Sequence, residues 1–286
     1  LLQKGVAYQT NGNVYFSVSK FPGYGKLSGK VLDELEAGAR VAVNEEKKDP
    51  RDFALWKVDG KHQMQWDAPF RGGVRGFPGW HIECSAMSMD LLGEQIDVHT
   101  GGEDNMFPHH ECEIAQTEAH TGKPFVSIWM HARHLLVDGT KMSKSLGNFF
   151  TVEDVLKKGY TGLELRYALV RVQYRQALNF TLKGLDEARA AIGRVLQARQ
   201  RLTRILDCLE QAGSDDLSSE CKAANEAFSS AMQDDLNVSG ALAAVFGLVD
   251  SVNVASPSLG SASEALRCFA RFEDVLGCFG PEPKNA

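Results

Sequence analysis

The chain has 286 residues, of which 43% are hydrophobic and 24% are charged. This composition is typical of a globular protein and excludes disordered, collagen-like and coiled-coil chains. No apolar run is long enough to cross a membrane, and the first residues do not resemble a secretory signal, so we predict a cytoplasmic protein with no membrane partner. The net charge of −6 argues against extensive wrapping of nucleic acid. Between Lys141 and Arg204, however, 13 Lys/Arg stand against five Asp/Glu, an excess that favours docking of a polyanion.

Residues with site chemistry are concentrated in the first half of the chain. All eight His and all four Trp lie between Trp56 and His134. The six cysteines are widely spaced, which predicts free thiols in a reducing compartment rather than a disulfide scaffold. We therefore expect a catalytic or binding site in the first half and a different role for the second.

Elements follow in chain order from hydrophobic spacing and turn residues. Residues 6–18 alternate around Asn11-Gly12, which predicts a β-hairpin, and residues 30–75 are charged and rich in Gly and Pro, as in an inserted module. From residue 80 the pattern predicts a helix over 84–92, a strand over 95–99, a helix over 108–121 and a strand near 135–137, a doubly wound α/β arrangement. Beyond about residue 151 the apolar spacing becomes helical and indicates a bundle. We predict boundaries that give domains 1–75, 76–150, 151–180 and 181–286.

One predicted helix carries two residues with metal-ligand chemistry. His109 and Glu113 are four apart, so imidazole and carboxylate share a helix face. With Cys84 from the preceding helix, these residue types suit a borderline-soft ion such as Zn²⁺. A His–Glu pair beside a buried cysteine is the structural alternative, because the three residues lack the close Cys spacing of common zinc sites.

Two further segments are candidates for nucleotide binding. His99 to Asp104 follows a predicted strand directly, and Gly101 and Gly102 would let the backbone approach a ligand, although an ordinary turn with Asp104 as a helix N-cap fits equally well. The loop with Lys141, Ser143, Lys144 and Ser145 places two ammonium groups and two hydroxyls between Asp138-Gly139 and Gly147-Asn148. Such a loop is either solvated surface or a device that closes on phosphates.

The exact strings resemble the cysteinyl-tRNA synthetase family of class I aminoacyl-tRNA synthetases. Lys141 to Asn148 (KMSKSLGN) is similar to the second class I signature, and three other strings resemble the family in the same order, with a looser echo in the helical part. These strings are Phe53 to Lys57 (FALWK), Gly79 to Met87 (GWHIECSAM), Phe107 to Glu113 (FPHHECE) and Met232 to Asn237 (MQDDLN).

The resemblance implies an α/β chain that carries the second half of the class I Rossmann-like nucleotide-binding fold. A small α+β insertion (connective-peptide) module would occupy 1–75, the KMSKS loop would close 76–150, a stem-contact linker would cover 151–180, and a tRNA-binding helical bundle would cover 181–286. The first half of the nucleotide fold, with the family's HIGH motif, would precede Leu1, so we expect a fragment that is inactive by itself. The implied parent enzyme is a monomer.

The same resemblance implies roles for individual residues. Cys84, His109 and Glu113 would hold one Zn²⁺, with a fourth, cysteine ligand before Leu1. Trp80 and His81 would border the pocket for the substrate cysteine, and Asp104 would help hold its amine or shape that pocket. The residues implied on the ATP side are His99, Gly101, Gly102, Ser143, Ser145, Lys144 and Lys141, with Lys144 and Lys141 as the catalytic cations on the phosphates.

The implied reaction joins L-cysteine to tRNA(Cys) through cysteinyl-adenylate, with ATP as substrate and Mg²⁺ on its phosphates. Zinc would explain how cysteine is told from serine, since a soft thiolate is a far better zinc ligand than a hydroxyl, whereas an apolar pocket separates such pairs by only ~1–3 kcal/mol. We expect Cys112 to be a packed thiol rather than a ligand.

Several alternatives stay open. A cysteine:aminosugar ligase of mycothiol synthesis would share the zinc and loop motifs without needing a tRNA-binding bundle. A non-catalytic zinc-binding or tRNA-binding module would need no first signature. The arginines between 189 and 204 would contact tRNA phosphates or would simply be solvated.

Overall fold

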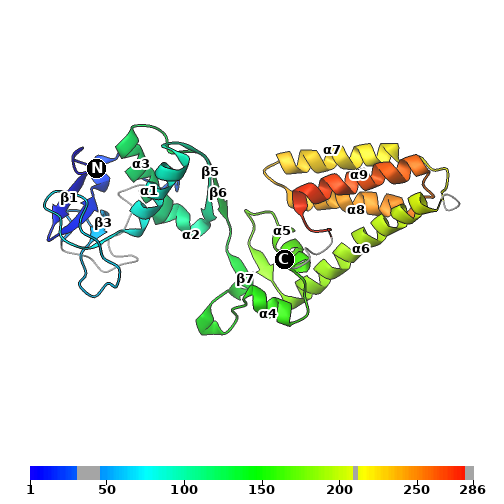
Figure 1. Ribbon diagram of the computed structural model, residues 1–286, viewed down its shortest axis with the longest axis horizontal. Coiled ribbons are helices and arrows are strands. Elements are labelled where there is room, and N and C mark those ends of the chain that lie inside the picture. Colours follow the sequence, from blue (N-terminus) through cyan, green and yellow to red (C-terminus); the bar gives the residue numbers. More distant parts are fainter. Residues whose placement is uncertain (31–45, 209–211, 281–286) are drawn as a thin grey trace. The chain divides into compact units, whose positions relative to one another are not determined.

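A computed structural model describes residues 1–30, 46–208 and 212–280 (Figure 1). The chain forms two compact units, Leu1–Ala132 and Arg133–Ala286. Residues 31–45 of the predicted insertion module, and residues 209–211 and 281–286 of the predicted bundle, lie outside the described residues. Among the described residues, no helix combines the length and the apolar character that a membrane span needs.

The first unit begins with an antiparallel sheet of strand order β1-β2-β3-β4. Asn11 and Gly12 connect β1 to β2 with φ values of 47° and 85°, the left-handed conformation of a tight hairpin turn, and Ala7 pairs with Phe16 across it. The predicted hairpin is therefore confirmed. The strands are β1 (Ala7–Thr10), β2 (Asn13–Phe16), β3 (Phe53–Lys57) and β4 (Phe77–Pro78), with a 3₁₀ turn η1 at Val18–Lys20.

Helices and a parallel strand pair complete the first unit. Helix α1 begins at Trp80, four residues before the start that the spacing predicts, so Trp80 and His81 belong to its first turn. Strand β5 pairs in parallel with β6, a strand that the sequence pattern did not predict. The elements are α1 (Trp80–Leu92), β5 (Ile96–Gly102), α2 (Glu103–Asn105), η3 (Met106–His110), α3 (Glu111–Thr121) and β6 (Val126–Ala132).

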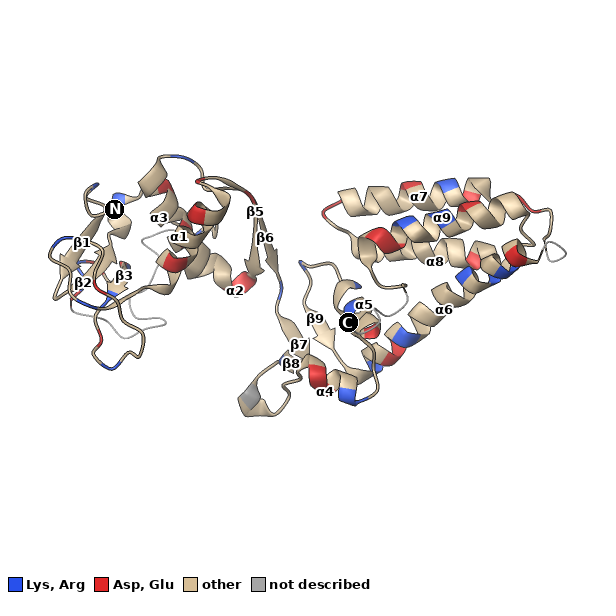
Figure 2. Cartoon of the chain, viewed as in Figure 1, with Lys and Arg blue, Asp and Glu red and all other residues tan. Residues whose placement is uncertain are grey.

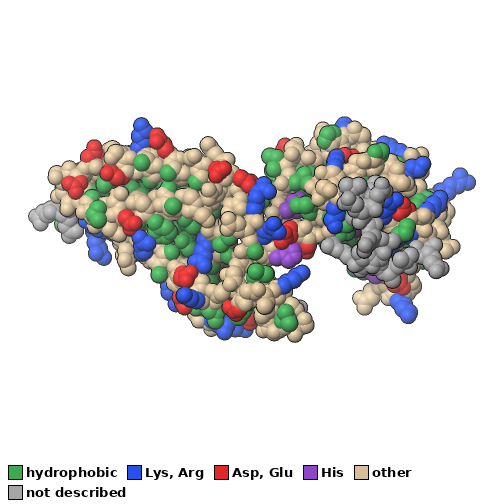
Figure 3. Space-filling model, turned by 180° about the vertical axis from the view of Figure 1, so that it is seen from behind, with side chains coloured by type: hydrophobic (Ala, Val, Ile, Leu, Met, Phe, Trp, Pro, Cys, Tyr) green, Lys and Arg blue, Asp and Glu red, His purple; other side chains and the backbone are tan. Residues whose placement is uncertain are grey.

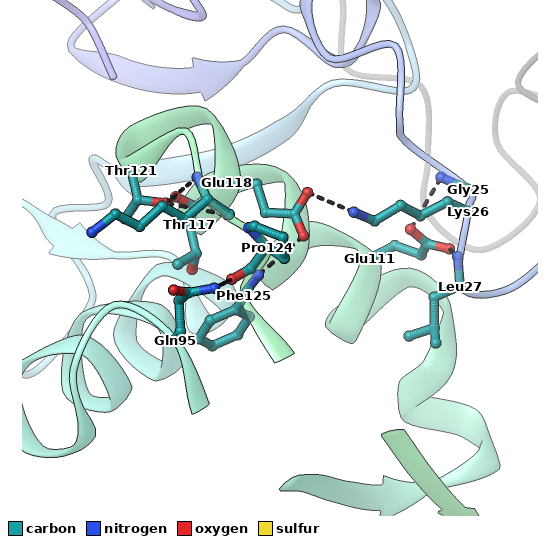
Figure 4. A network of polar contacts seen from close by, with 11 residues as sticks. Gly25, Lys26, Leu27, Gln95, Glu111, Thr117, Glu118, Thr121, Pro124 and Phe125 are labelled. Atoms are coloured by element: carbon teal, nitrogen blue, oxygen red, sulfur yellow. Dashed lines mark hydrogen bonds and ion pairs between the residues drawn. The ribbon is translucent and has the colours of Figure 1, made fainter. Parts of the chain in front are cut away.

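A buried carboxylate fastens the start of α3 to the loop after η1. Glu111 is fully buried, and its oxygens accept hydrogen bonds from the backbone amides of Gly25 (3.0 Å), Leu27 (2.8 Å) and Ser28 (2.6 Å) and from the Ser28 hydroxyl (2.9 Å). Figure 4 shows this network beside the ion pair that Lys26 and Glu118 make one to two turns farther along α3. These bonds hold the first turn of α3 against the loop at residues 25–28. His109 and His110 directly precede this turn, and Glu113 lies in it.

The second unit combines a small mixed sheet with a helical bundle (Figure 1). Strand β7 lies between antiparallel β8 and parallel β9 and coincides with the strand predicted near 135–137. Helices α6 to α9 pack as a bundle, and its core is continuous with residues of β7, β9 and α5. The elements are β7 (Leu135–Val137), β8 (Thr140–Lys141), η4 (Lys144–Leu146), α4 (Val152–Lys157), α5 (Gly162–Val170), β9 (Leu178–Phe180), α6 (Leu182–Asp207), α7 (Ser218–Gln233), α8 (Val238–Val254) and α9 (Leu259–Leu276).

Local sequence explains where the bundle helices start and stop. Thr161, Thr181 and Ser258 each accept a hydrogen bond from a backbone amide in the first turn of the helix that follows. Helix α9 ends at Gly277, whose φ of 61° suits glycine. The apolar residues of α6 at spacings of three and four, such as Leu185, Ile192 and Val195, are the buried ones, as the helical spacing predicts.

Candidate functional site

Helices α1 and α3 bring the three predicted metal ligands together. The ligand atoms of Cys84, His109 and Glu113 all lie within 4.8 Å of one another, and His109 and Glu113 are buried. His109 precedes α3 by two residues, and the helical turn puts its Nε2 atom 2.7 Å from Glu113 Oε1. The shared face predicted from the four-residue spacing is therefore confirmed.

The two oxygens of Glu113 have different surroundings. His99 Nε2 lies 2.6 Å from Oε2, at hydrogen-bond distance. Oε1 is buried and accepts no well-directed hydrogen bond from any described residue, although His109 Nε2 is close. A buried carboxylate oxygen left in this way costs free energy unless a cation or donor reaches it. Oε1, the His109 imidazole and the Cys84 thiol form an oxygen, nitrogen and sulfur donor set that fits Zn²⁺.

Electrostatics favour a cation at this donor set. Burial opposes ionisation of Glu113, but the imidazoles of His109 and His99, each within 2.7 Å of a carboxylate oxygen, outweigh it and hold the pKa of the carboxyl at about 2. The carboxylate is therefore charged at neutral pH. Burial, and then the Glu113 carboxylate, raise the pKa of the Cys84 thiol, so without a cation the sulfur keeps its proton. A bound divalent ion would reverse that preference.

A second imidazole orients His109. His81 Nδ1 lies 2.6 Å from His109 Nδ1, which leaves His109 Nε2 turned toward Glu113. The Trp80 ring lies with its centroid 4.1 Å from that of His109, and its side chain is 60% exposed. An outer partner on the second ring nitrogen is the usual support of a metal-bound histidine. Both residues predicted to border the cysteine pocket thus lie beside His109, one of the predicted metal ligands.

A histidine cluster extends from the other side of Glu113. The ligand atoms of His99, His110 and Glu113 form a second group within 4.8 Å, and His110 Nδ1 lies 2.7 Å from His131 Nε2. Figure 3 shows histidine side chains reaching the surface of the molecule. Neither His110 nor His131 was predicted as a site residue. The signal for them was the concentration of all eight histidines in one half of the sequence.

Gly101 has a packing requirement in this cluster. A Cβ atom added to Gly101 would lie 2.7 Å from Cε1 of the His110 ring. Asp104 is exposed and lies inside the short helix α2, whose N-cap is Gly102, so the alternative of Asp104 as an N-cap is wrong. The nucleotide role predicted for His99, Gly101 and Gly102, and the amine-binding role of Asp104, stay predictions.

We expect acid to weaken the first unit between pH 6.5 and about 4. Burial is the main cause that lowers the pKa of both His81 and His110 from 6.5 to about 4, because an imidazolium is poorly solvated there. In this window the unfolded chain binds protons that the folded chain does not, so stability falls as pH falls. All four tryptophans lie in the first unit, so their fluorescence in urea titrations with a chelator present reports it alone.

The matched variants for this pH effect are His110→Gln and His120→Gln. His120 is exposed at the end of α3, and its replacement should leave the pH dependence of the urea midpoint unchanged. His110→Gln should flatten it. A midpoint that is the same at pH 7 and pH 4.5 in the unmodified chain would contradict the expectation.

The loop Lys141–Asn148, with its two lysines, lies in the second unit, and the side chain of Asn148 bonds across it. The Oδ1 atom of Asn148 accepts from the Ser143 amide (2.8 Å), and its Nδ2 atom donates to the Thr140 hydroxyl (2.9 Å) and to the Lys141 carbonyl (3.2 Å). The Ser143 and Ser145 hydroxyls are 2.6 Å apart, and Lys141 is exposed. The sequence pattern indicated Asn148 only as a flank of the loop. In the structure its side chain holds the loop in shape through these three hydrogen bonds.

Cys112 is a packed thiol, as predicted. It is completely buried among aromatic side chains of the strand module, and the Tyr24 hydroxyl lies 3.5 Å from its sulfur. It belongs to neither of the ligand groups found among the described residues.

The arginines of α6 are mostly engaged within the second unit. Lys and Arg line this helix in Figure 2. Arg189 pairs with Glu164 (2.6 Å), Arg194 pairs with Asp250 (2.7 Å), and Arg199 and Arg201 donate to backbone carbonyls. Arg204 is exposed. Arg189, Arg199 and Arg204 line a pocket of about 720 Å³ between α5, α6 and residues 279–280.

Comparison with known proteins extends along nearly the whole chain. A family model described as the class I (C) tRNA synthetase catalytic domain matches residues 1–190, and a DALR domain model matches residues 227–280. The cysteine–tRNA ligase of Protochlamydia amoebophila is 47% identical over 293 residues, which cover 97% of this chain and 59% of that protein. The cysteine–tRNA ligase of Thermus thermophilus is 45% identical over 284 residues, which cover 98% of this chain and 58% of that protein.

Solved structures agree in fold. A putative arginyl-tRNA synthetase from Campylobacter jejuni aligns with a TM-score of 0.55 at 16% identity, over 99% of this chain and 60% of that one. The LeuRS–tRNA–LeuAMS ternary complex of Agrobacterium radiobacter K84 aligns with a TM-score of 0.53 at 16% identity, over 77% of this chain and 36% of that one. The chain spans somewhat under two thirds of the length of its curated relatives. Because the catalytic-domain match covers more than half of its residues, the chain belongs to the class I (C) tRNA synthetase family.

Proposed function

We propose that this chain is part of a cysteine–tRNA ligase, which activates L-cysteine with ATP and transfers it to tRNA(Cys). The observation that carries the proposal is the convergence of the Cys84 sulfur, the His109 imidazole and the buried Glu113 carboxylate, whose ligand atoms lie within 4.8 Å of one another, in a matched class I domain. The curated relatives named cysteine–tRNA ligase support the same reading.

The chain's own residues would select the substrate at this donor set. Cys84, His109 and Glu113 would hold Zn²⁺, and a bound zinc would supply a soft Lewis acid that prefers a sulfur ligand to an oxygen ligand. His81 and His99 orient His109 and Glu113 through contacts of 2.6 Å, so the donor geometry is set before substrate arrives. Trp80, largely exposed beside His109, would cover the substrate side chain.

Activation would draw on the residues of two segments. The backbone at Gly101 and Gly102, with His99, would face ATP, and Asp104 would hold the amine of cysteine. Lys141 and Lys144 would stabilise the charge that develops on the phosphates as the cysteine carboxylate attacks the α-phosphorus, with Mg²⁺ bound to ATP. Asn148, Ser143 and Ser145 would hold the loop in shape for this step.

Transfer to tRNA would use the second unit. The exposed Arg204 at the pocket on α6 would offer a cation to a phosphate backbone, whereas Arg189 and Arg199 in the same lining are engaged with Glu164 and a backbone carbonyl. A four-helix bundle of this size, with its DALR match, favours a tRNA substrate over the small aminosugar of a mycothiol ligase. We place the enzyme in the cytoplasm as a monomer, with domains at 1–75, 76–150, 151–180 and 181–286.

The proposal is tested by amino-acid-dependent ATP–pyrophosphate exchange in the intact protein that carries these 286 residues. We expect exchange with cysteine, and a kcat/KM for serine lower by more than the roughly 200-fold that an apolar pocket achieves. Cys84→Ala should abolish exchange, whereas Cys208→Ala, at the end of α6, should not. Exchange that is equal with serine, or unchanged in Cys84→Ala, would refute the proposal.

A further inference from the structure

Two cysteines of the helical bundle face each other across a helix–helix contact. Cys221 lies in α7 and Cys268 in α9, and both side chains are completely buried in the core of the second unit. The Cys268 thiol reaches Cys221, and its Sγ lies 3.9 Å from the Cys221 carbonyl oxygen. Helices α7 and α9 run side by side in Figure 1. Neither cysteine takes part in the proposed ligase chemistry.

Polar groups converge on one sulfur of the pair. Asn225 Nδ2 donates to Cys268 Sγ at 3.0 Å and to the Cys221 carbonyl at 2.8 Å. Arg271, which is exposed, donates to the same sulfur at 3.4 Å. Two donors, one of them a guanidinium, are the surroundings of a thiolate rather than of an inert core thiol.

The surroundings shift the pKa values of the two thiols in opposite directions. The hydrogen bond from Cys221, helped by Asn225 and Arg271, lowers the pKa of Cys268 despite its burial. The bond to Cys268, then burial and the carboxylates of Glu264 and Glu220, raise the pKa of Cys221. The contacts assign the same roles: Asn225 and Arg271 both donate to the Cys268 sulfur, which makes Cys268 the nucleophile of the pair and Cys221 its neighbour.

We propose that Cys221 and Cys268 form a redox-sensitive dithiol, which a hydroperoxide converts reversibly into a disulfide bond that joins α7 to α9. The Cys268 thiolate attacks an oxygen of the hydroperoxide, the O–O bond breaks, and the leaving oxygen takes up a proton. Cys268 is then a sulfenic acid. The Cys221 sulfur attacks it, the S–O bond breaks and water leaves, so the pair loses two electrons and two protons and the hydroperoxide is reduced.

Polar side chains cover the Cys268 sulfur on the side that faces the surface. Cys268 Sγ lies directly under the exposed Arg271 side chain and beside the half-buried Asn225. Because Cys268 is completely buried, a hydrogen peroxide molecule would have to enter from this side as the exposed Arg271 side chain moves. Cys278 is buried in the same core, but its sulfur contacts the Leu276 carbonyl (3.3 Å) and burial raises its pKa to about 11, so it is the matched control.

The test is peptide mapping of the 286-residue chain after hydrogen peroxide treatment and alkylation of free thiols. We expect one Cys221–Cys268 disulfide, with Cys278 still alkylated, and full recovery of both thiols with dithiothreitol. Cys221→Ser should leave Cys268 as a sulfenic acid that dimedone labels, and Cys268→Ser should abolish labelling of the pair. Cys278→Ser should form the disulfide like the unmodified chain.

If a serine variant fails to fold, peptide mapping of the unmodified chain by itself tests the proposed disulfide. Recovery of Cys221 and Cys268 as free thiols after the half-buried Cys84 and Cys208 have oxidised would overturn the proposal. So would a disulfide from either residue to a different cysteine, or oxidation that dithiothreitol does not reverse. The proposal is independent of the ligase activity, because neither its residues nor its readout involves ATP, tRNA or zinc.

Discussion

The Cys84→Ala variant of this chain is expected to bind Zn²⁺ at least about 100-fold more weakly than the unmodified chain. Cys84 supplies the only sulfur near the buried Glu113 carboxylate among the described ligand groups. Loss of an outer partner of a metal site costs about 10- to 100-fold in affinity, and loss of a direct ligand costs at least the upper figure. Competition with a chromophoric chelator measures the dissociation constant, and Co²⁺ substitution reports the thiolate–metal bond directly.

Two further variants locate the ion. Glu113 belongs to both ligand groups, whereas His110 belongs only to the group with His99. His110→Asn should therefore leave zinc affinity and the thiolate–cobalt absorption nearly unchanged, and Cys208→Ala should change neither. Weaker binding in His110→Asn with unchanged binding in Cys84→Ala would place the ion in the histidine group. No zinc binding by the unmodified chain would remove the site from this chain altogether.

Glu111→Ala is expected to destabilise the first unit by about 3 kcal/mol or more. The variant leaves the amides of Gly25, Leu27 and Ser28 without their buried acceptor, and each hydrogen bond to a charged group contributes about 1.5–3 kcal/mol. Urea unfolding followed by tryptophan fluorescence measures the change, since all tryptophans lie in this unit.

The structure also predicts a consequence for the metal. Because Glu111 anchors the helical turn that carries His109 and Glu113, Glu111→Ala should weaken zinc binding as well, and excess zinc should recover part of the lost stability. Glu111→Gln keeps one acceptor oxygen, so its loss of unfolding free energy should be smaller than that of Glu111→Ala. Glu94→Gln removes an exposed ion pair with Lys123 and should not change the unfolding curve. Equal curves for Glu111→Ala and Glu94→Gln would show that the anchor is unimportant.

Local patterns in the sequence predicted most of the elements. The Asn11-Gly12 turn, the strand at Leu135–Val137 and the long amphipathic helix α6 depend on turn residues and apolar spacing, which act over a few residues. The contact between His109 and Glu113 was predicted in the same way, because a four-residue spacing on a helix determines which side chains share a face, and their role as metal ligands stays a prediction. The family itself followed from short strings, and the comparisons confirmed it.

Strand β6 could not be predicted in this way. Its residues Val126–Ala132 mix Ser, Trp and His with apolar side chains, and the strand forms because it pairs in parallel with β5, about 30 residues earlier in the sequence. Its existence depends on a partner that the local pattern does not contain.

The chemistry of individual atoms was likewise decided by the tertiary structure. The sequence determined that Cys84, His109 and Glu113 were available to a metal, but packing alone buried the Glu113 carboxylate against His109 and placed His99 beside Glu113 and His81 beside His109. Packing also set Cys221 against Cys268. Spacing along the chain determines which residue types can meet within one helix, whereas burial and contacts between distant segments determine which of their atoms remain free to react.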